Sequence, residues 1–162
     1  MADVYKRQAD GSDTITHIER LQFSDQGVAL DLDGNAGQVA RALGAVFGKA
    51  AVGNKPLVGI GLQLLDGGMS YADFIALAVS TSAFEQLAGD RSNTAFVNTL
   101  YRNVVGVAPD AASRDYFVAL LESGALTQAS FARLASDTAA NAQQIGLAGL
   151  TNTGLGYVWL EG

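Results

Sequence analysis

The sequence contains no cysteine and only one histidine, His17. Without cysteine the chain has no disulfide, no thiolate metal ligand and no cysteine nucleophile. A serine–histidine arrangement would have to use His17, with Asp13 or Glu19 as its carboxylate, but no serine nucleophile motif lies near it. A structural histidine on a β-prone segment is the simpler interpretation, and we expect no enzymatic activity.

Long apolar runs and basic clusters are missing as well. The longest apolar stretch, Leu57–Leu65, is interrupted by two glycines and a glutamine and is too short to span a membrane. Ten basic residues against sixteen acidic ones give a net charge of −6. Without a basic stripe to neutralise phosphates, we expect no nucleic-acid partner. Residues 1–10 have no apolar core, so we expect no Sec signal peptide.

The residue pattern changes from strand-like to helix-like near residue 35. Before that point, β-prone runs alternate with glycine and aspartate turns, which predicts short strands over Val4–Arg7, Thr14–Ile18, Arg20–Phe23 and Val28–Leu32. Their apolar face would be formed by Ile15, Ile18, Leu21 and Phe23. We therefore predict that residues 1–35 form a β-rich hairpin segment and a linker.

From residue 36 the apolar period becomes helical. One face of the first helix carries Val39, Leu43, Val46 and Phe47. The pattern predicts a mainly α fold with about eight helices, the last and longest running from residue 139 to about 157. The helices fall into two tandem four-helix-like units, residues 36–89 and 90–162, which we expect to pack as one globular domain.

The two units are copies of one another. Leu64–Ser70, followed by Phe74, returns as Leu121–Thr127, followed by Phe131. The spacing is 57 residues and stays near that value upstream. A fixed spacing of this kind predicts repeated supersecondary units that bury their apolar faces against each other.

Several motifs of the second unit follow a known pattern: Leu100-Tyr101, the turn Gly106-Val107-Ala108-Pro109-Asp110, Tyr116-Phe117, and Gly124 three residues before Thr127. In these motifs the unit resembles the bacterial helical family called domain of unknown function 4214. Val107 stands where that family usually has arginine, and Phe117 where it usually has tryptophan. The first unit lacks the proline–aspartate turn around residues 49–60, so we expect it to keep only the packing role.

The N-terminal segment carries a second resemblance. Residues 11–25, with Gly11, Asp13 and Ile15, are similar to the segment that closes calcium-binding RTX β-rolls of the hemolysin type, and residues 30–37 resemble the linker into the helical family. This order is found at the C-terminal end of proteins exported by type I secretion. The resemblance implies a fragment of a longer bacterial protein, secreted or at the cell surface, with an upstream β-roll and the secretion apparatus as partners.

Calcium is the cofactor with a positive signal. Asp31, Asp33 and Asn35 alternate with apolar or glycine residues, as oxygen ligands of hard cations often do. An EF-hand starting at Asp31 is excluded, because Ala36 and Ala42 stand where the loop needs glycine and glutamate. The alternative is a solvated acidic turn that caps the first helix through Asp33 or Asn35.

Two further sets of side chains have a functional and a structural interpretation. Asp110 and Asp115 suggest a carboxylate pair, but a helix N-cap and a solvent-facing residue explain them better. The aromatic set could line a groove for a sugar or peptide, or form the core between helices; it consists of Tyr101, Tyr116, Phe117 and Tyr157.

These observations lead to one functional prediction and one alternative. We predict a non-catalytic C-terminal module of a type I-secreted RTX-like protein, which caps the β-roll and serves as a helical interaction domain. The alternative is a surface adhesion or assembly module that binds a glycan, a peptide or another copy of itself. An exposed apolar groove between the two units would favour this alternative.

Overall fold

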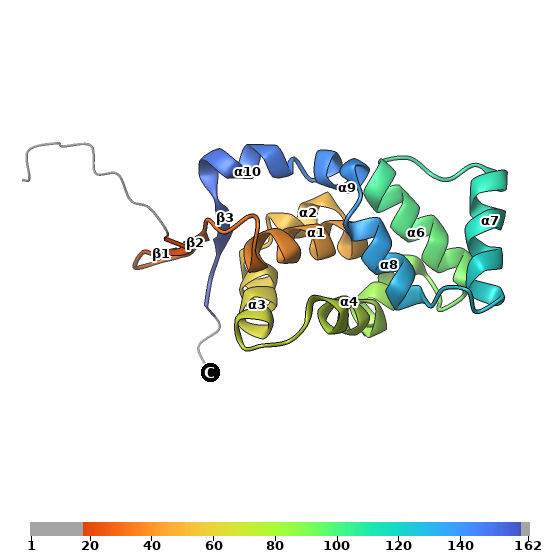
Figure 1. The fold of residues 1–162 in the computed structure, drawn as a ribbon, viewed down its shortest axis with the longest axis horizontal. Coiled ribbons are helices and arrows are strands. Elements are labelled where there is room, and N and C mark those ends of the chain that lie inside the picture. Colours follow the sequence, from red (N-terminus) through yellow and green to blue (C-terminus); the bar gives the residue numbers. More distant parts are fainter. Residues whose placement is uncertain (1–17, 160–162) are drawn as a thin grey trace, which may run out of the picture.

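The computed structural model describes residues 18–159 as a mainly helical molecule with a small sheet at one end (Figure 1). The strands are β1 (Arg20–Gln22), β2 (Gly27–Ala29) and β3 (Leu155–Tyr157). The helices of this described part are α1 (Asn35–Phe47), α2 (Lys49–Val52), α3 (Lys55–Asp66), α4 (Tyr71–Ser80), α5 (Ser82–Ala88), α6 (Asn93–Val105), α7 (Ala111–Glu122), α8 (Gln128–Ser136), α9 (Ala139–Gln144) and α10 (Leu147–Thr153). The predicted mainly α fold is confirmed. The predicted strand over residues 4–7, almost all of the one over 14–18, and His17 lie outside the described residues.

The predicted long C-terminal helix is wrong. Residues 139–157 form α9, α10 and strand β3 instead. Gly146 and Gly154 both adopt φ of +70°, a left-handed backbone conformation that ends a right-handed helix. The short helix α2 is also additional, and it fills the connection between α1 and α3.

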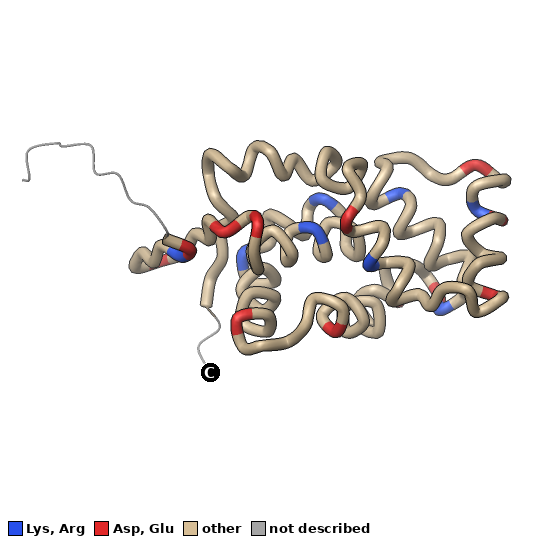
Figure 2. Tube along the Cα trace, in the orientation of Figure 1, with Lys and Arg blue, Asp and Glu red and all other residues tan. Residues whose placement is uncertain are grey.

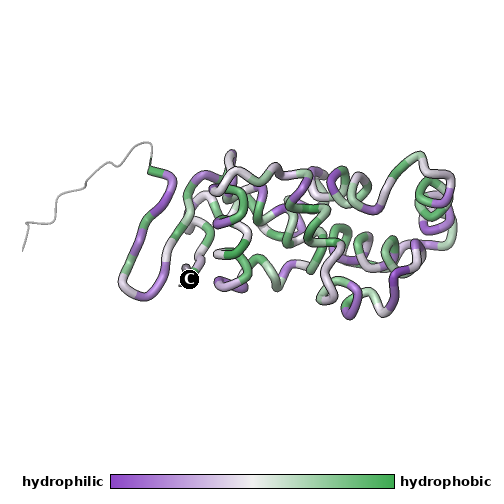
Figure 3. The backbone as a smooth tube through the Cα atoms, turned by 90° about the horizontal axis from the view of Figure 1, so that it is seen from below, coloured by the Kyte–Doolittle hydropathy of each residue, from purple (hydrophilic) through white to green (hydrophobic). Residues whose placement is uncertain are grey.

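The sheet joins the two ends of the described chain. Its order is β1-β2-β3, both pairs are antiparallel, and Gly27 lies opposite Tyr157. The β1–β2 hairpin extends away from the helical body (Figure 3). The predicted apolar face of this segment is wrong at Ile18 and Phe23, which are exposed, whereas Tyr157 is fully buried. Leu21 is half-buried, and Ile15 lies outside the described residues. The apolar contact that the hairpin needs therefore comes from β3, 130 residues away in the sequence.

Helix α1 forms the centre of the molecule. Its buried residues are Ala36, Gly37, Val39, Ala40, Ala42, Leu43, Gly44, Ala45 and Val46, which leaves little of the helix in water. Helices α3 and α4 of the first unit and α6, α8 and α9 of the second all pack on it. The two units therefore share one core.

The structure places equivalent helices at matching positions in the two units. N-cap side chains recur in pairs: Asn54 with Asp110, Ser70 with Thr127, and Thr81 with Thr138. Each accepts a hydrogen bond from a backbone N–H of the first turn, so the starts of these helices are determined locally.

The spacing between copies is not uniform, however. Gly68 and Gly124, both at positive φ, end α3 and α7 and lie 56 residues apart, so Leu65 is the partner of Leu121. The 57-residue spacing begins only after these glycines, because Ala125 is an additional residue in the second unit.

No helix within residues 18–159 is both long enough and apolar enough to cross a lipid bilayer.

Replacing Gly27 with alanine should destabilise the chain. A Cβ atom at this position would lie 2.2 Å from Cζ of Tyr157, deep inside van der Waals contact. Overpacking of this kind costs about 1–3 kcal/mol, or several degrees in melting temperature. Gly149 in α10 is the control, because nothing lies within 4 Å of a Cβ there. Thermal unfolding should show a decrease for Gly27→Ala and none for Gly149→Ala; equal melting temperatures would contradict the packing of β3 on β2.

Candidate functional site

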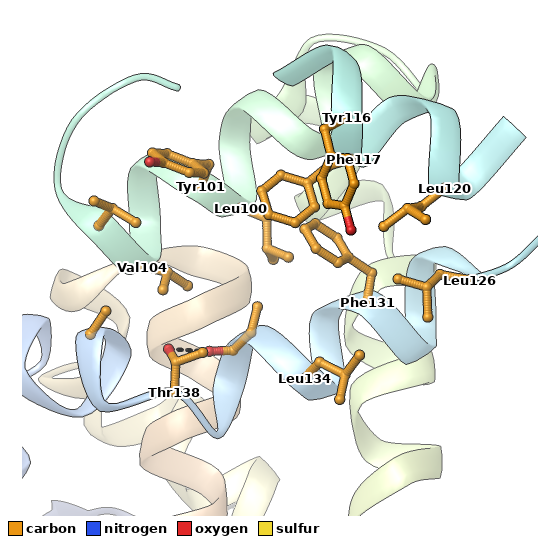
Figure 4. A pocket seen from close by; sticks show the side chains of 13 residues that line it. Leu100, Tyr101, Val104, Tyr116, Phe117, Leu120, Leu126, Phe131, Leu134 and Thr138 are labelled. Carbon is orange, nitrogen blue, oxygen red and sulfur yellow. Dashed lines mark hydrogen bonds between the residues drawn. The ribbon is translucent and has the colours of Figure 1, made fainter. Parts of the chain in front are cut away.

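The second unit contains an apolar groove formed by α6, α7, α8 and the start of α9 (Figure 4). Its volume is about 380 Å³. The floor is built from Leu100 and Phe131, which are buried, while Tyr116 and Leu134 at the mouth are 62% and 59% exposed. We call this site the α6–α9 groove; its remaining lining residues are Tyr101, Val104, Val105, Phe117, Leu120, Leu126, Ala135, Thr138 and Ala140.

Three of the four predicted aromatic residues meet in this groove. The Phe117 ring lies 4.9 Å from Phe131, 5.3 Å from Tyr116 and 6.5 Å from Tyr101, measured between ring centroids. Tyr157 is not part of the groove. It is buried in the sheet, where burial raises the pKa of its hydroxyl and no hydrogen-bond partner meets that hydroxyl.

A narrower copy of the groove exists in the first unit. Phe74, Leu77, Ala78 and Thr81 line it, and each lies 57 residues before a lining residue of the α6–α9 groove: Phe131, Leu134, Ala135 and Thr138. The volume of this copy is only about 90 Å³. The same helix arrangement therefore leaves a narrow groove in the first unit and a wide one in the second.

A single pair of equivalent positions accounts for much of this difference. Gly61 of α3 lies so close to α1 and α4 that a Cβ there would be 2.8 Å from Val39 and 3.1 Å from Phe74. With the 56-residue spacing of these helices, the counterpart of Gly61 is Phe117. A phenyl ring cannot enter the space that glycine leaves, so α7 packs less closely on α8 than α3 packs on α4.

Sequence reasoning missed the aliphatic half of the groove, above all Leu100, Leu126 and Leu134. The signal was present in the repeat, because Leu134 follows Phe131 by three residues as Leu77 follows Phe74. Only the tertiary arrangement shows that these side chains face α7 across an open space.

The groove lies in a part of the chain that matches a family model. Residues 75–144 match one family model, Domain of unknown function (DUF4214). The DUF4214 match begins within α4 and ends with α9, so it contains every residue that lines the groove. It does not reach residues 1–35, where the resemblance to RTX proteins stays a prediction. No curated protein and no solved structure matches the chain significantly.

The acidic turn at residues 31–35 is held by an arginine that sequence reasoning did not consider. Arg20 of β1 pairs with Asp31, and its second nitrogen donates to both carboxylate oxygens of Asp66 at 2.9 and 3.0 Å. The other oxygen of Asp31 accepts from the backbone N–H of Ala36 at 3.2 Å. Asn35 donates its amide N–H to Asp66 at 2.8 Å. The α1 cap thus comes from Asp31, not from Asp33 or Asn35.

These contacts fit a calcium site poorly. Both carboxylate oxygens of Asp31 already have donors, and Asn35 turns its nitrogen rather than its oxygen toward Asp66. Asp33 is exposed. Within the described residues no three carboxylate or histidine groups gather as metal ligands. Calcium binding at Asp31, Asp33 and Asn35 stays a prediction.

The remaining carboxylate candidates have structural roles. Asp110 is the N-cap of α7, and the hydrogen bond from the Ser113 backbone N–H, 2.7 Å long, holds the pKa of the Asp110 carboxyl below its usual range. Asp115 is exposed and pairs with Arg114. Basic and acidic residues are interspersed along the chain (Figure 2).

Calcium should leave the stability of the isolated chain almost unchanged. A native-state site at one hundred times its dissociation constant would add about 2.7 kcal/mol, which is several degrees in a domain of this size. Because Arg20 already neutralises Asp31, we expect equal melting temperatures in EDTA and in millimolar calcium, with magnesium as the control ion. A rise of several degrees with calcium alone would contradict this expectation. A response confined to Arg20→Ala would show that Arg20 competes with the ion.

Proposed function

We propose that this chain is a non-catalytic C-terminal module of a type I-secreted RTX-like protein, in which it caps the β-roll and connects it to a helical interaction domain. The observation that supports this proposal is the edge of β1 that no other strand of residues 18–159 covers. Leu30 donates its N–H to the Glu19 carbonyl, and Phe23 donates to Gln26. In an antiparallel pair, successive residues of a strand point their backbone N–H and C=O groups alternately toward the partner strand and away from it. Among the described residues, Arg20 and Gln22 therefore have no backbone partner for the N–H and C=O groups that they point to the edge.

This edge is suited to continue another sheet. Unpaired backbone groups on an edge strand invite pairing with a further strand. Ile18, Phe23 and Leu30 at this end of the molecule are 38%, 54% and 40% exposed. The open end of a β-roll likewise exposes unpaired backbone groups and apolar surface. Pairing β1 with the end of the β-roll would give the backbone groups of both edges hydrogen-bond partners and would cover the apolar surface of both.

The hairpin is fixed to the helical body by backbone pairing and by a side-chain contact. On the side away from β1, β2 pairs with β3, and Val158 just beyond β3 donates its N–H to the Lys55 carbonyl of α3 at 3.2 Å. Arg20 adds a second tie to α3 through Asp66. A strand added to β1 would therefore be held in a fixed position relative to the helical body.

The alternative, an adhesion or assembly module, draws support from a different feature. An apolar groove that reaches the surface is the kind of site that such a module would use. The α6–α9 groove lies inside the second unit, however, and not between the two units as the alternative anticipated.

Gln22→Pro tests the capping role. The Gln22 N–H faces the open edge, so proline removes an edge donor without breaking the β1–β2 pairing. The variant should melt like Gln22→Ala in the isolated chain. With a calcium-binding nonapeptide β-roll fused upstream, circular dichroism and light scattering should show a folded monomer in calcium for Gln22→Ala, and aggregation or a higher calcium midpoint for Gln22→Pro. Identical behaviour of the two fusions would contradict capping through β1.

A further inference from the structure

We propose that the α6–α9 groove is a binding site for one small, uncharged, apolar molecule. This inference goes beyond the capping role and does not depend on it. It rests on the composition of the groove wall, on its volume and on the weak anchoring of one of its helices.

The wall determines the charge and polarity of the ligand. None of the residues that line the groove carries a charge. Its polar side-chain groups are the hydroxyls of Tyr101, Tyr116 and Thr138, and the Thr138 hydroxyl already donates to the Ala135 carbonyl at 2.8 Å (Figure 4). An ionised group would lose its hydration here without gaining a partner, and a sugar would leave most of its hydroxyls unpaired. A ligand with at most one or two hydroxyls avoids both penalties.

The size of the groove agrees with a small molecule. Its volume of about 380 Å³ falls within the range of small-molecule sites, about 300–1,000 Å³. The counterpart in the first unit, at about 90 Å³, is too small for the same ligand. We therefore expect one molecule per chain.

Helix α7 is the adjustable wall. The only buried residue of α7 is Leu121, whereas the equivalent helix α3 buries Val58, Gly59, Gly61, Leu62 and Leu65. Few buried contacts mean that a small shift of α7 costs little free energy. The groove can thus adapt to the shape of an apolar ligand.

A second copy of the chain is a poorer occupant. The large apolar side chains exposed around the groove are Val105, Val107, Tyr116 and Leu134. Charged residues such as Arg114, Asp115 and Arg133 lie on the same helices and are partly or largely exposed. A stable dimer buries about 20–30 residues on each side. The core of such an interface is apolar and depleted in charged residues, and four apolar side chains among charged ones offer little of such a core.

Leu134→Asp and Leu77→Asp form a matched pair for the test. Both leucines are exposed, at 59% and 44%, and they occupy equivalent positions on α8 and α4, so both variants should fold. The probe is N-phenylnaphthylamine, an uncharged dye whose fluorescence rises in apolar surroundings. The wild-type chain should bind one dye molecule saturably. Leu134→Asp should weaken binding by at least about tenfold, because the aspartate brings a charge to the mouth of the groove, while Leu77→Asp should bind like the wild type.

Competition then tests the ligand class. Decanol should displace the dye, and decanoate, which has the same chain length and a negative charge, should displace it far less well. No saturable binding, equal effects of the two aspartate variants, or equal competition by decanol and decanoate would each overturn the proposal. So would sedimentation showing a dimer that Leu134→Asp dissociates, since the groove would then bind a second copy. None of these results bears on Gln22→Pro, so failure here and failure of the capping role are distinguishable.

Discussion

The fold depends on the close packing of one helix, α1, against helices of both units. Small residues make this possible: Gly44 lies so near α9 that a Cβ there would be 2.2 Å from Ile145. Polar ties reinforce the contact, because Asn103 of α6 and the buried Asn141 of α9 donate side-chain hydrogen bonds to α1 carbonyls. A helix buried on most of its surface cannot be stable alone, so α1 needs both units around it.

The internal duplication shows why one groove is wider than the other. Both units use the same helix order and the same capping positions, and both place a phenylalanine, Phe74 or Phe131, on the floor. They diverge at Gly61 and Phe117. Glycine allows α3 to approach closely, and β3 then covers its other side, whereas α7 has an aromatic ring facing inward and lies at the end of the molecule remote from the sheet (Figure 1). The first unit thus shows how narrow the groove is when glycine stands at the position of Phe117.

The acidic N-terminal turn shows how one pattern can support two interpretations. Alternating oxygen-bearing side chains at 31, 33 and 35 are compatible with a cation site or with a structural turn. In the folded chain Arg20 supplies the positive charge, and Asp31 also caps α1. The guanidinium connects β1, the turn and α3 through Asp31 and Asp66, so the charges that suggested calcium also help to fix the hairpin on the helical body.

The sequence by itself determined the local features: the mainly helical class, the helix starts at Ser70, Asp110 and Thr127, and the existence of a repeat. These depend on side chains within one or two turns, and caps and apolar periods report them directly. The tertiary structure alone decided that Tyr157 belongs to a strand beside Gly27 and that Arg20 meets Asp66. It also decided that the groove beside Phe117 is wide where the one beside Gly61 is narrow. Each of these joins segments far apart in the chain, and the free energy of such contacts depends on packing that no local window of sequence contains.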